Sequence, residues 1–303
     1  MPLRENIIQH HSKDPFLNQE KPRHGWLVAN DIRMHYLQWG KSRQSVIALH
    51  GLASSAHWYS LVLPLLNPRF QRLAFDQRAH GKTEQTPTGY DWSTLSTDII
   101  GAMDELEIET ACIIGHSWGA SVAAHLAAIY PNRVSRLVLI DGGIAPQRST
   151  KIPWESFKER LSPRDIYGPR ERYISSLRNQ FTDVWTDQLE KIVMTMVKVN
   201  SDGTVDEILD PNNHEQVLYS MWNDPASNIF GDIKAPTLLV PAGPKKTVKK
   251  DFAARKMLGV QEAMDKIPGA RLHWIEDTVH DIAYDQPSVL ADVIQNFLES
   301  TPE

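Results

Sequence analysis

Short apolar runs alternate with longer amphipathic segments along most of the chain. Runs of four to seven residues, many of them β-branched, predict strands at 32–38, 45–49, 71–75, 111–114, 136–140, 237–240 and 271–275. Helical periodicity predicts helices near 58–66, 92–106, 119–130, 250–266 and 288–299. Strands that alternate with helices require crossover connections, which is typical of a mostly parallel sheet covered on both faces. The pattern therefore predicts an α/β fold.

This alternation stops between 144 and 233, where the chain is predicted to be helical. The segment is rich in aromatic residues: Trp154, Tyr167, Tyr173, Phe181, Trp185, Tyr219 and Trp222. A block of this size between two strands is best interpreted as a helical cap (lid) over the strand ends, although its aromatics could also fill the cap's own core. The predicted organisation is an N-terminal arm at 1–24, a core domain at 25–143 and 234–303, and a cap at 144–233.

Composition narrows the classes of function. The 303 residues are 41% hydrophobic, with a net charge of −5 and a pI near 6.2, so the chain offers no basic surface to nucleic acid or anionic lipid. No apolar run approaches the length of a bilayer span, and residues 1–20 are too polar for a secretory signal. A cytoplasmic location is expected. Cys112 is the single cysteine, so no internal disulfide can form.

A serine between two glycines is the most informative motif. Residues 115–119 read GHSWG, directly after a predicted strand and at the start of a predicted helix. In that setting Gly-x-Ser-x-Gly predicts a nucleophile elbow, in which a strained pivot residue presents its hydroxyl beside unpaired helix-terminal amides. The glycines give the turn the clearance it needs. The alternative is an ordinary helix start with Ser117 as its N-cap.

With this motif in place, the chain resembles the α/β-hydrolase superfamily from about residue 25 to 297. Two further stretches carry the resemblance, LHGLASS at 49–55 and FDQRAHG at 75–81. By that likeness the backbone amides of Leu52 and Trp118 would form an oxyanion hole. The second stretch resembles a turn that is structural in the family, so Asp76 and Arg78 are left out of the predicted catalytic set.

A histidine and a carboxylate should accompany the serine. His280 lies just beyond the last predicted strand, where this architecture gathers its sites, and is predicted to be the general base. The family usually carries the acid after the strand at 237–240, but the loop at 242–247 reads AGPKKT and has none. Asp141, at the end of the strand 136–140, is the predicted catalytic acid, Asp251 is the second candidate, and another acid or none is the remaining alternative. Some relatives, including many haloalkane dehalogenases, carry the acid at the first of these positions.

These residues predict a serine hydrolase that acts on small or medium apolar carboxylic esters, with lactones as an alternative substrate. Leu52, Trp58 and Trp118 are expected to line the substrate pocket. The reaction requires no metal or organic cofactor, and the chain is expected to be a monomer or homodimer. The Trp-Gly pair after Ser117 also resembles the sequence of haloalkane dehalogenases and epoxide hydrolases, but the nucleophile of those enzymes is an aspartate. Carbon-carbon bond hydrolases, cofactor-free haloperoxidases, hydroxynitrile lyases and a ligand receptor with little turnover are competing hypotheses.

Overall fold

The computed structural model describes residues 20–144, 152–161, 166–244 and 250–301, without the side chains of 244 and 250–253. Most of the predicted N-terminal arm lies outside this description. Within the described ranges, no helix has both the length and the hydropathy needed to cross a bilayer.

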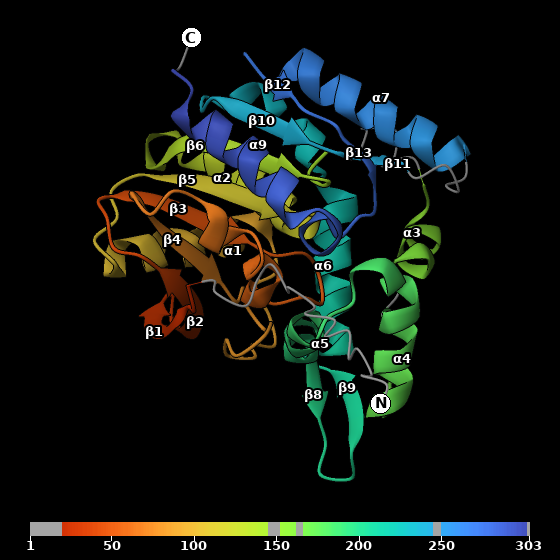
Figure 1. The fold of residues 1–303 in the computed structure, drawn as a ribbon. Helices are drawn as coiled ribbons and strands as arrows, with labels where there is room; N and C mark the ends of the chain where they lie inside the picture. The colour runs from red at the N-terminus through yellow and green to blue at the C-terminus, as the bar shows by residue number, and fades with distance from the viewer. Residues whose placement is uncertain (1–19, 145–151, 162–165, 245–249, 302–303) are drawn as a thin grey trace, which may run out of the picture.

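An eight-stranded, mostly parallel sheet forms the centre of the molecule, in the order β1-β2-β4-β3-β5-β6-β10-β12 (Figure 1). Its strands are β1 (Arg23–Ala29), β2 (Ile32–Trp39), β3 (Gln44–Leu49), β4 (Phe70–Phe75), β5 (Ala111–His116), β6 (Val134–Ile140), β10 (Thr237–Val240) and β12 (Arg271–Leu272). The pairs β1-β2 and β2-β4 are antiparallel and the other five are parallel. The predicted α/β class is therefore confirmed. The prediction missed β1 because this edge strand is largely exposed and has little apolar pattern.

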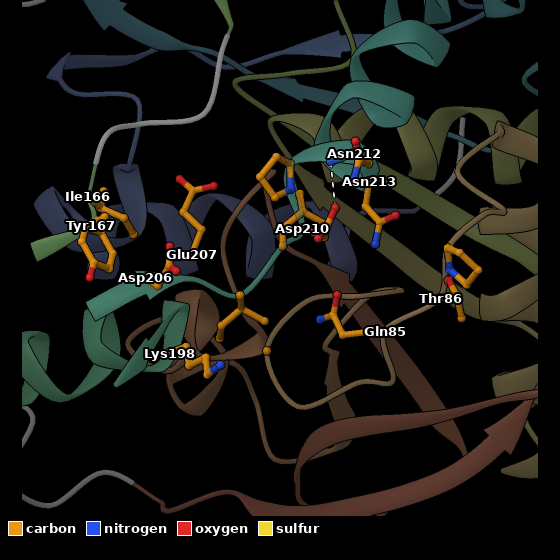
Figure 2. A pocket seen from close by; sticks show the side chains of 15 residues that line it. Gln85, Thr86, Ile166, Tyr167, Lys198, Asp206, Glu207, Asp210, Asn212 and Asn213 are labelled. Atoms are coloured by element: carbon orange, nitrogen blue, oxygen red, sulfur yellow. Dashed lines mark hydrogen bonds between the residues drawn. The ribbon is translucent and has the colours of Figure 1, made fainter. Parts of the chain in front are cut away.

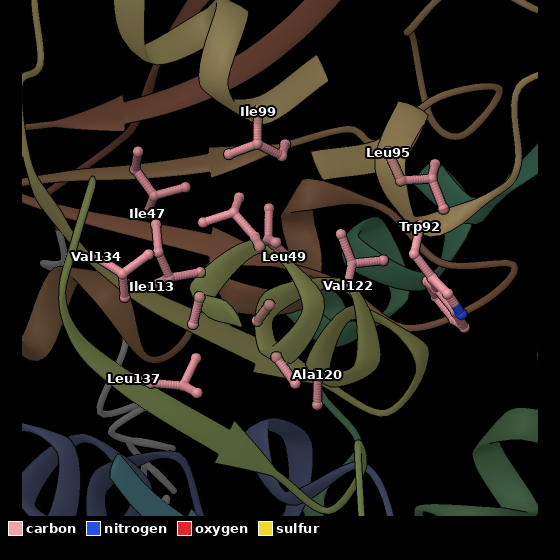
Figure 3. Close-up of a cluster of buried hydrophobic side chains, with 14 of the residues drawn as sticks. Ile47, Leu49, Trp92, Leu95, Ile99, Ile113, Ala120, Val122, Val134 and Leu137 are labelled. Carbon is pink, nitrogen blue, oxygen red and sulfur yellow. The ribbon is translucent and has the colours of Figure 1, made fainter. Parts of the chain in front are cut away.

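Successive residues of each central strand enter different hydrophobic clusters, one on each face of the sheet. Ile113 of β5 belongs to the cluster formed with α1 (Trp92–Glu105), α2 (Trp118–Ile129) and α7 (Lys250–Lys266), part of which Figure 3 shows. Its neighbour Ile114 belongs to the cluster formed with α9 (Pro287–Glu299). A strand buried on both faces explains the continuous apolar runs of the sequence.

The helix predicted at 58–66 is wrong. The structure has two short 3₁₀ turns there, η1 (Ala56–Tyr59) and η2 (Leu63–Leu65). Pro64 lies in the second turn and has no amide hydrogen to donate, which prevents a continuous α-helix. The remaining short elements are η3 (Pro131–Arg133), α8 (Ile282–Asp285) and a parallel pair, β11 (Ala242–Pro244) with β13 (Ile275–Thr278).

The segment at 144–233, called the cap segment below, contains strands as well as the predicted helices. Its helices are α3 (Trp154–Arg160), α4 (Arg170–Gln180), α5 (Asp187–Val193) and α6 (Pro211–Asn223), with 3₁₀ turns η5 (Thr182–Val184), η6 (Met194–Met196), η7 (Ala226–Asn228) and η8 (Phe230–Asp232). Three short antiparallel strands form a separate sheet: β7 (Gly168–Pro169), β9 (Thr204–Glu207) and β8 (Val197–Val199). In Figure 1 the green and teal elements α3, α4, α5, α6, β8 and β9 lie together beside the central sheet.

Strand β5 passes into helix α2 through a single intervening residue, Ser117, and glycines make that turn possible. A Cβ on Gly119 would lie 2.4 Å from the carbonyl oxygens of Leu49 and His50. A Cβ on Gly115 would lie 2.3 Å from the carbonyl oxygen of Gly119. Real side chains do not approach backbone atoms this closely, so both positions exclude any larger residue unless the backbone moves.

We expect Gly119→Ala to reduce the free energy of unfolding by about 1–3 kcal/mol, because the new methyl group collides with the backbone of the β3 end. Denaturant melts monitored by circular dichroism measure this change. Gly231→Ala is the control, since a Cβ at Gly231 meets no atom within 4 Å. Equal stability of the two variants would contradict the packing argument.

Candidate active site

Ser117 has a strained backbone at the carboxyl end of β5. Its φ of 54° and ψ of −118° lie in a region that residues with a side chain rarely adopt. Its amide donates a hydrogen bond to the Ile140 carbonyl oxygen at 3.0 Å, which ties the turn to the end of β6. Its side chain makes no N-cap hydrogen bond, so the ordinary helix-start interpretation is wrong and the hydroxyl is available for another partner.

That partner is His280, in the loop between β13 and α8. Its Nε2 lies 2.9 Å from Ser117 Oγ. The loop is held by His116, whose Nε2 donates to the His280 carbonyl oxygen at 3.1 Å. The His116 ring in turn stacks on Trp58, with 3.9 Å between ring centroids. The structure thus brings together two residues that are 163 positions apart in sequence.

Asp141 completes a hydrogen-bonded chain of three side chains. Its Oδ2 accepts a hydrogen bond from His280 Nδ1 at 2.7 Å. Its Oδ1 accepts two others, from the Ala242 amide at 2.9 Å and from Lys256 Nζ at 2.7 Å. The carboxylate that meets His280 therefore comes from the end of β6. The side chain of the other candidate, Asp251, lies outside the described residues.

Lys256 is a feature of the site that the sequence did not reveal. It lies on α7, far from every motif, and its ammonium group also donates to the Ala242 carbonyl oxygen at 3.0 Å. A lysine on an amphipathic helix gives no signal of such a contact, because solvated lysines occupy the same positions. Only the packing of α7 in the hydrophobic cluster on one face of the sheet brings it to the carboxylate.

Asp141 and His280 each favour the charged form of the other. Burial alone would raise the pKa of Asp141, but the hydrogen bond from His280 and the positive charges of His280 and Lys256 lower it to about 2. Burial opposes the charged form of His280, yet the hydrogen bond and the charge of Asp141 outweigh it and raise its pKa. The imidazole side chain remains 54% exposed toward the cavity. Asp141 is therefore ionised near neutral pH and can orient the imidazole and stabilise its protonated form.

The backbone amides of Leu52 and Trp118, expected to form an oxyanion hole, donate to no other group of the described residues. The loop that carries Leu52 is held by buried polar side chains. His80 Nε2 accepts from the Ala53 amide at 3.2 Å, and Asp76 Oδ1 accepts from the Ala56 amide at 2.7 Å. Arg78 forms a two-point ion pair with Asp98 instead. Asp76 and Arg78 thus hold the surrounding loops and do not contact Ser117 or His280.

A cavity of about 150 Å³ opens onto Ser117 and His280. One wall is the loop 51–54, which includes Leu52, and another is the edge formed by Asp281 and Tyr284. The cap segment supplies a third wall: Tyr173, Leu177, Gln180, Phe181, Val193 and Met196. The expectation that Trp58 and Trp118 line this cavity is wrong. Both are about 1% exposed and pack beneath the site, against His116 and His80 respectively.

A larger hollow of about 1120 Å³ lies between the loop at 81–87 and the cap strands (Figure 2). Polar side chains such as Gln85, Asp210 and Asn213 line it, and none of the three hydrogen-bonded residues does. No group of three His, Cys, Asp or Glu side chains suited to a metal ion occurs in the described part of the chain. The candidate chemistry therefore lies in the smaller cavity.

Comparison with known proteins matches residues 44–282 to the family described as alpha/beta hydrolase fold. The chain is 25% identical over 258 residues to the 2-hydroxy-6-oxononadienedioate/2-hydroxy-6-oxononatrienedioate hydrolase of Paraburkholderia phymatum, covering 81% of this chain and 86% of that protein. It is 32% identical over 174 residues to epoxide hydrolase 3 of Siraitia grosvenorii, covering 55% of this chain and 54% of that protein.

A solved structure with a similar fold is that of E-2-(acetamidomethylene)succinate hydrolase. The TM-score is 0.76 at 20% sequence identity, covering 92% of this chain and all of that chain. At this identity the likeness concerns the fold.

We expect the raised pKa of His280 to be lower in Asp141→Asn than in the wild-type protein. The variant loses the charge of Asp141, which raises the pKa, while burial still lowers it. NMR titration of ring-labelled histidine measures both values, with the resonance assigned through His280→Gln. An unchanged pKa in Asp141→Asn would show that the carboxylate does not act on this ring.

Proposed function

The chain belongs to the alpha/beta hydrolase fold family, and we propose that it is a serine hydrolase of small, uncharged carboxylic esters or lactones. The observation that carries this proposal is the hydrogen-bonded chain in which Ser117 Oγ lies 2.9 Å from His280 Nε2 and His280 Nδ1 lies 2.7 Å from Asp141. A serine hydroxyl is a poor nucleophile near neutral pH unless a base removes its proton. His280 has the position, and Asp141 the charge, that this step requires.

The proposed reaction has two halves. Ser117 Oγ attacks the ester carbonyl as His280 Nε2 takes its proton, and the tetrahedral intermediate collapses when the imidazolium protonates the leaving alcohol. Water then attacks the acyl-enzyme with the same imidazole as base, which releases the acid and restores Ser117. Asp141 remains ionised throughout and stabilises the imidazolium in each half. None of these steps needs a cofactor.

The negative charge that develops on the carbonyl oxygen needs hydrogen-bond donors. The amides of Leu52 and Trp118 suit this role because neither is occupied by another acceptor of the described residues. Trp118 begins helix α2, so its amide also points along the positive end of the helix dipole. Together these amides would supply the electrostatic stabilisation on which acyl transfer depends.

The cavity supports a small and uncharged substrate. Its volume of about 150 Å³ leaves room for a short acyl group beside the leaving alcohol. The cap segment covers that room with apolar and aromatic side chains and one amide, Gln180. The described lining contains Asp281 but no lysine or arginine. A carboxylate substituent would therefore meet like charge without a cationic partner, which is unfavourable in a partly desolvated site.

Carbon-carbon bond hydrolysis is the second candidate. The relative from Paraburkholderia phymatum, which aligns with most of this chain, is named as a hydrolase of 2-hydroxy-6-oxononadienedioate and 2-hydroxy-6-oxononatrienedioate. The same three residues could serve such a reaction. The substrate in that name is a dioate, with two carboxylates, and the described lining offers it no cation. An ester or lactone without charge fits this lining better.

Epoxide hydrolysis and ligand reception without turnover are less well supported by the site. Epoxide opening through an alkyl-enzyme needs a carboxylate nucleophile, and position 117 holds a serine. The reason to consider a receptor is the lack of an acid in the loop at 242–247. That reason weakens because Asp141 lies within hydrogen-bond distance of His280.

We expect Ser117→Ala and His280→Ala each to lower kcat/KM for p-nitrophenyl butyrate by roughly 10⁴-fold or more, because each removes a group on which covalent catalysis depends. Release of p-nitrophenolate measures the rate. Ser93→Ala and His273→Ala, at exposed positions away from the cavity, are matched controls and should retain wild-type rates. Substantial turnover by Ser117→Ala would refute the proposal, as would a wild type no faster than that variant.

We expect p-nitrophenyl acetate and butyrate to be hydrolysed with higher kcat/KM than the octanoate, because the cavity is small. Phe181→Ala should raise the octanoate-to-butyrate ratio of kcat/KM by about tenfold, since it removes a ring from the cap wall. Val184→Ala, in the cap segment but outside the cavity lining, should leave the ratio unchanged. If both variants keep the wild-type ratio, Phe181 does not limit acyl length.

A further inference from the structure

Lys256 contacts the proposed catalytic acid from outside the set of residues that the reaction uses. Its Nζ lies 2.7 Å from Asp141 Oδ1 and 3.0 Å from the Ala242 carbonyl oxygen. The lysine side chain is only 14% exposed, and that of Asp141 only 2%. The contact is therefore a largely buried ion pair and differs from the solvated lysine pairs of the surface.

The two carboxylate oxygens have separate partners. Oδ2 is used by His280, while Oδ1 is held by Lys256 and by the Ala242 amide. With three donors in fixed places, the carboxylate cannot rotate without losing at least one hydrogen bond. Lys256 thus helps to hold the face of Asp141 that points to the imidazole.

A buried carboxylate also needs compensation of its charge at every stage of the reaction. His280 must be neutral when it acts as a base, so at that stage it cannot neutralise Asp141. An unpaired buried charge is costly. Lys256 contacts the other oxygen of the carboxylate and does not take part in the proton transfer, so it can compensate for the carboxylate at each stage.

We propose that Lys256 is a positioning residue that keeps Asp141 aimed at His280 and that partly cancels the negative charge which Asp141 presents to the imidazole. This inference rests on the proposed function of Ser117, His280 and Asp141. It assigns to α7 a part in the chemistry, in addition to its packing against the sheet.

The groups around the imidazole determine the direction of the effect. Asp141 and Asp281 favour the protonated form of His280, and Lys256 disfavours it. His116 lies on another side, with 4.8 Å between ring centroids, and burial lowers its pKa to about 3. It is therefore neutral near pH 7. Removing the charge of Lys256 should raise the pKa of His280, so a smaller fraction of the imidazole would be free to act as a base at neutral pH.

The test compares Lys256→Met, which removes the charge, with Lys256→Arg, which keeps it. We expect Lys256→Met to lower kcat for p-nitrophenyl butyrate at pH 7 by roughly tenfold and to move the acidic limb of the pH–rate profile to higher pH. Lys256→Arg should keep the limb near its wild-type position. Lys266→Met is the matched control on the same helix, since that lysine pairs with Glu262 at the surface.

A double-variant cycle separates an effect through Asp141 from a general loss of structure. In the Asp141→Asn background, Lys256→Met should change kcat less than twofold, because the charge on which it acts is gone. A further tenfold loss there, or an acidic limb that stays in place in Lys256→Met, would overturn the proposal.

NMR titration of His280 gives a readout that does not depend on turnover. A higher pKa in Lys256→Met than in the wild type would support the proposal, and an unchanged or lower pKa would refute it. Thermal unfolding of each variant verifies that it is folded under the conditions in which the His280 pKa is compared with that of the wild type. If the His280 pKa is higher in Lys256→Met than in the wild type but the wild type hydrolyses no ester, the proposed function is refuted and the electrostatic role of Lys256 stands.

Discussion

The left-handed turn at Ser117 is the constraint on which the rest of the site depends. The turn is possible only because Gly115 and Gly119 leave the backbone room, and it is held by the hydrogen bond from the Ser117 amide to Ile140. The neighbouring strand end is coupled to it, since a Cβ on Gly142 would lie 2.2 Å from the Ser117 carbonyl oxygen. The ends of β5 and β6 therefore form one packed unit, which carries Ser117 and Asp141 side by side.

Burial of Asp141 at the end of β6 determines how the charge of its carboxylate is compensated. Asp141 is nearly inaccessible to water, so its charge is compensated by protein groups: His280, Lys256 and the Ala242 amide. These contacts lower its pKa to about 2 in spite of burial. His116, buried without such a carboxylate, has a pKa of about 3 and is neutral. Two histidines in neighbouring positions thus differ in charge behaviour because only one contacts an ionised acid.

The loop that carries Leu52 depends on a second group of buried polar side chains. His80 and Asp76 accept hydrogen bonds from the amides of Ala53 and Ala56, and Asp76 also accepts one from His35 at 2.7 Å. Because these groups are buried, each must be satisfied within the protein, which restricts the loop to a narrow set of conformations. The backbone that carries Leu52, proposed to supply an oxyanion-hole amide, is thus held by side chains that do not contact Ser117 or His280.

Much of the fold and part of the site followed from the sequence. Strand and helix periodicity indicated the parallel sheet, since burial on both faces requires continuous apolar strands, and GHSWG indicated the turn because only glycine permits such close backbone contact. The family resemblance is confirmed by the match over 44–282. Edge strand β1 and the strands of the cap segment were missed because short or exposed strands have little apolar pattern.

Contacts between distant segments were decided by the tertiary structure alone. The family resemblance favoured Asp141 over Asp251, but its contact with His280 depends on where elements pack. The approach of Lys256 from α7 and the burial of Trp58 and Trp118 beneath the cavity depend on packing in the same way. Local patterns report the preferences of neighbouring residues along the chain. They carry no information on which of several carboxylates reaches an imidazole 139 positions away, because that depends on the order of the strands and the angle of a helix.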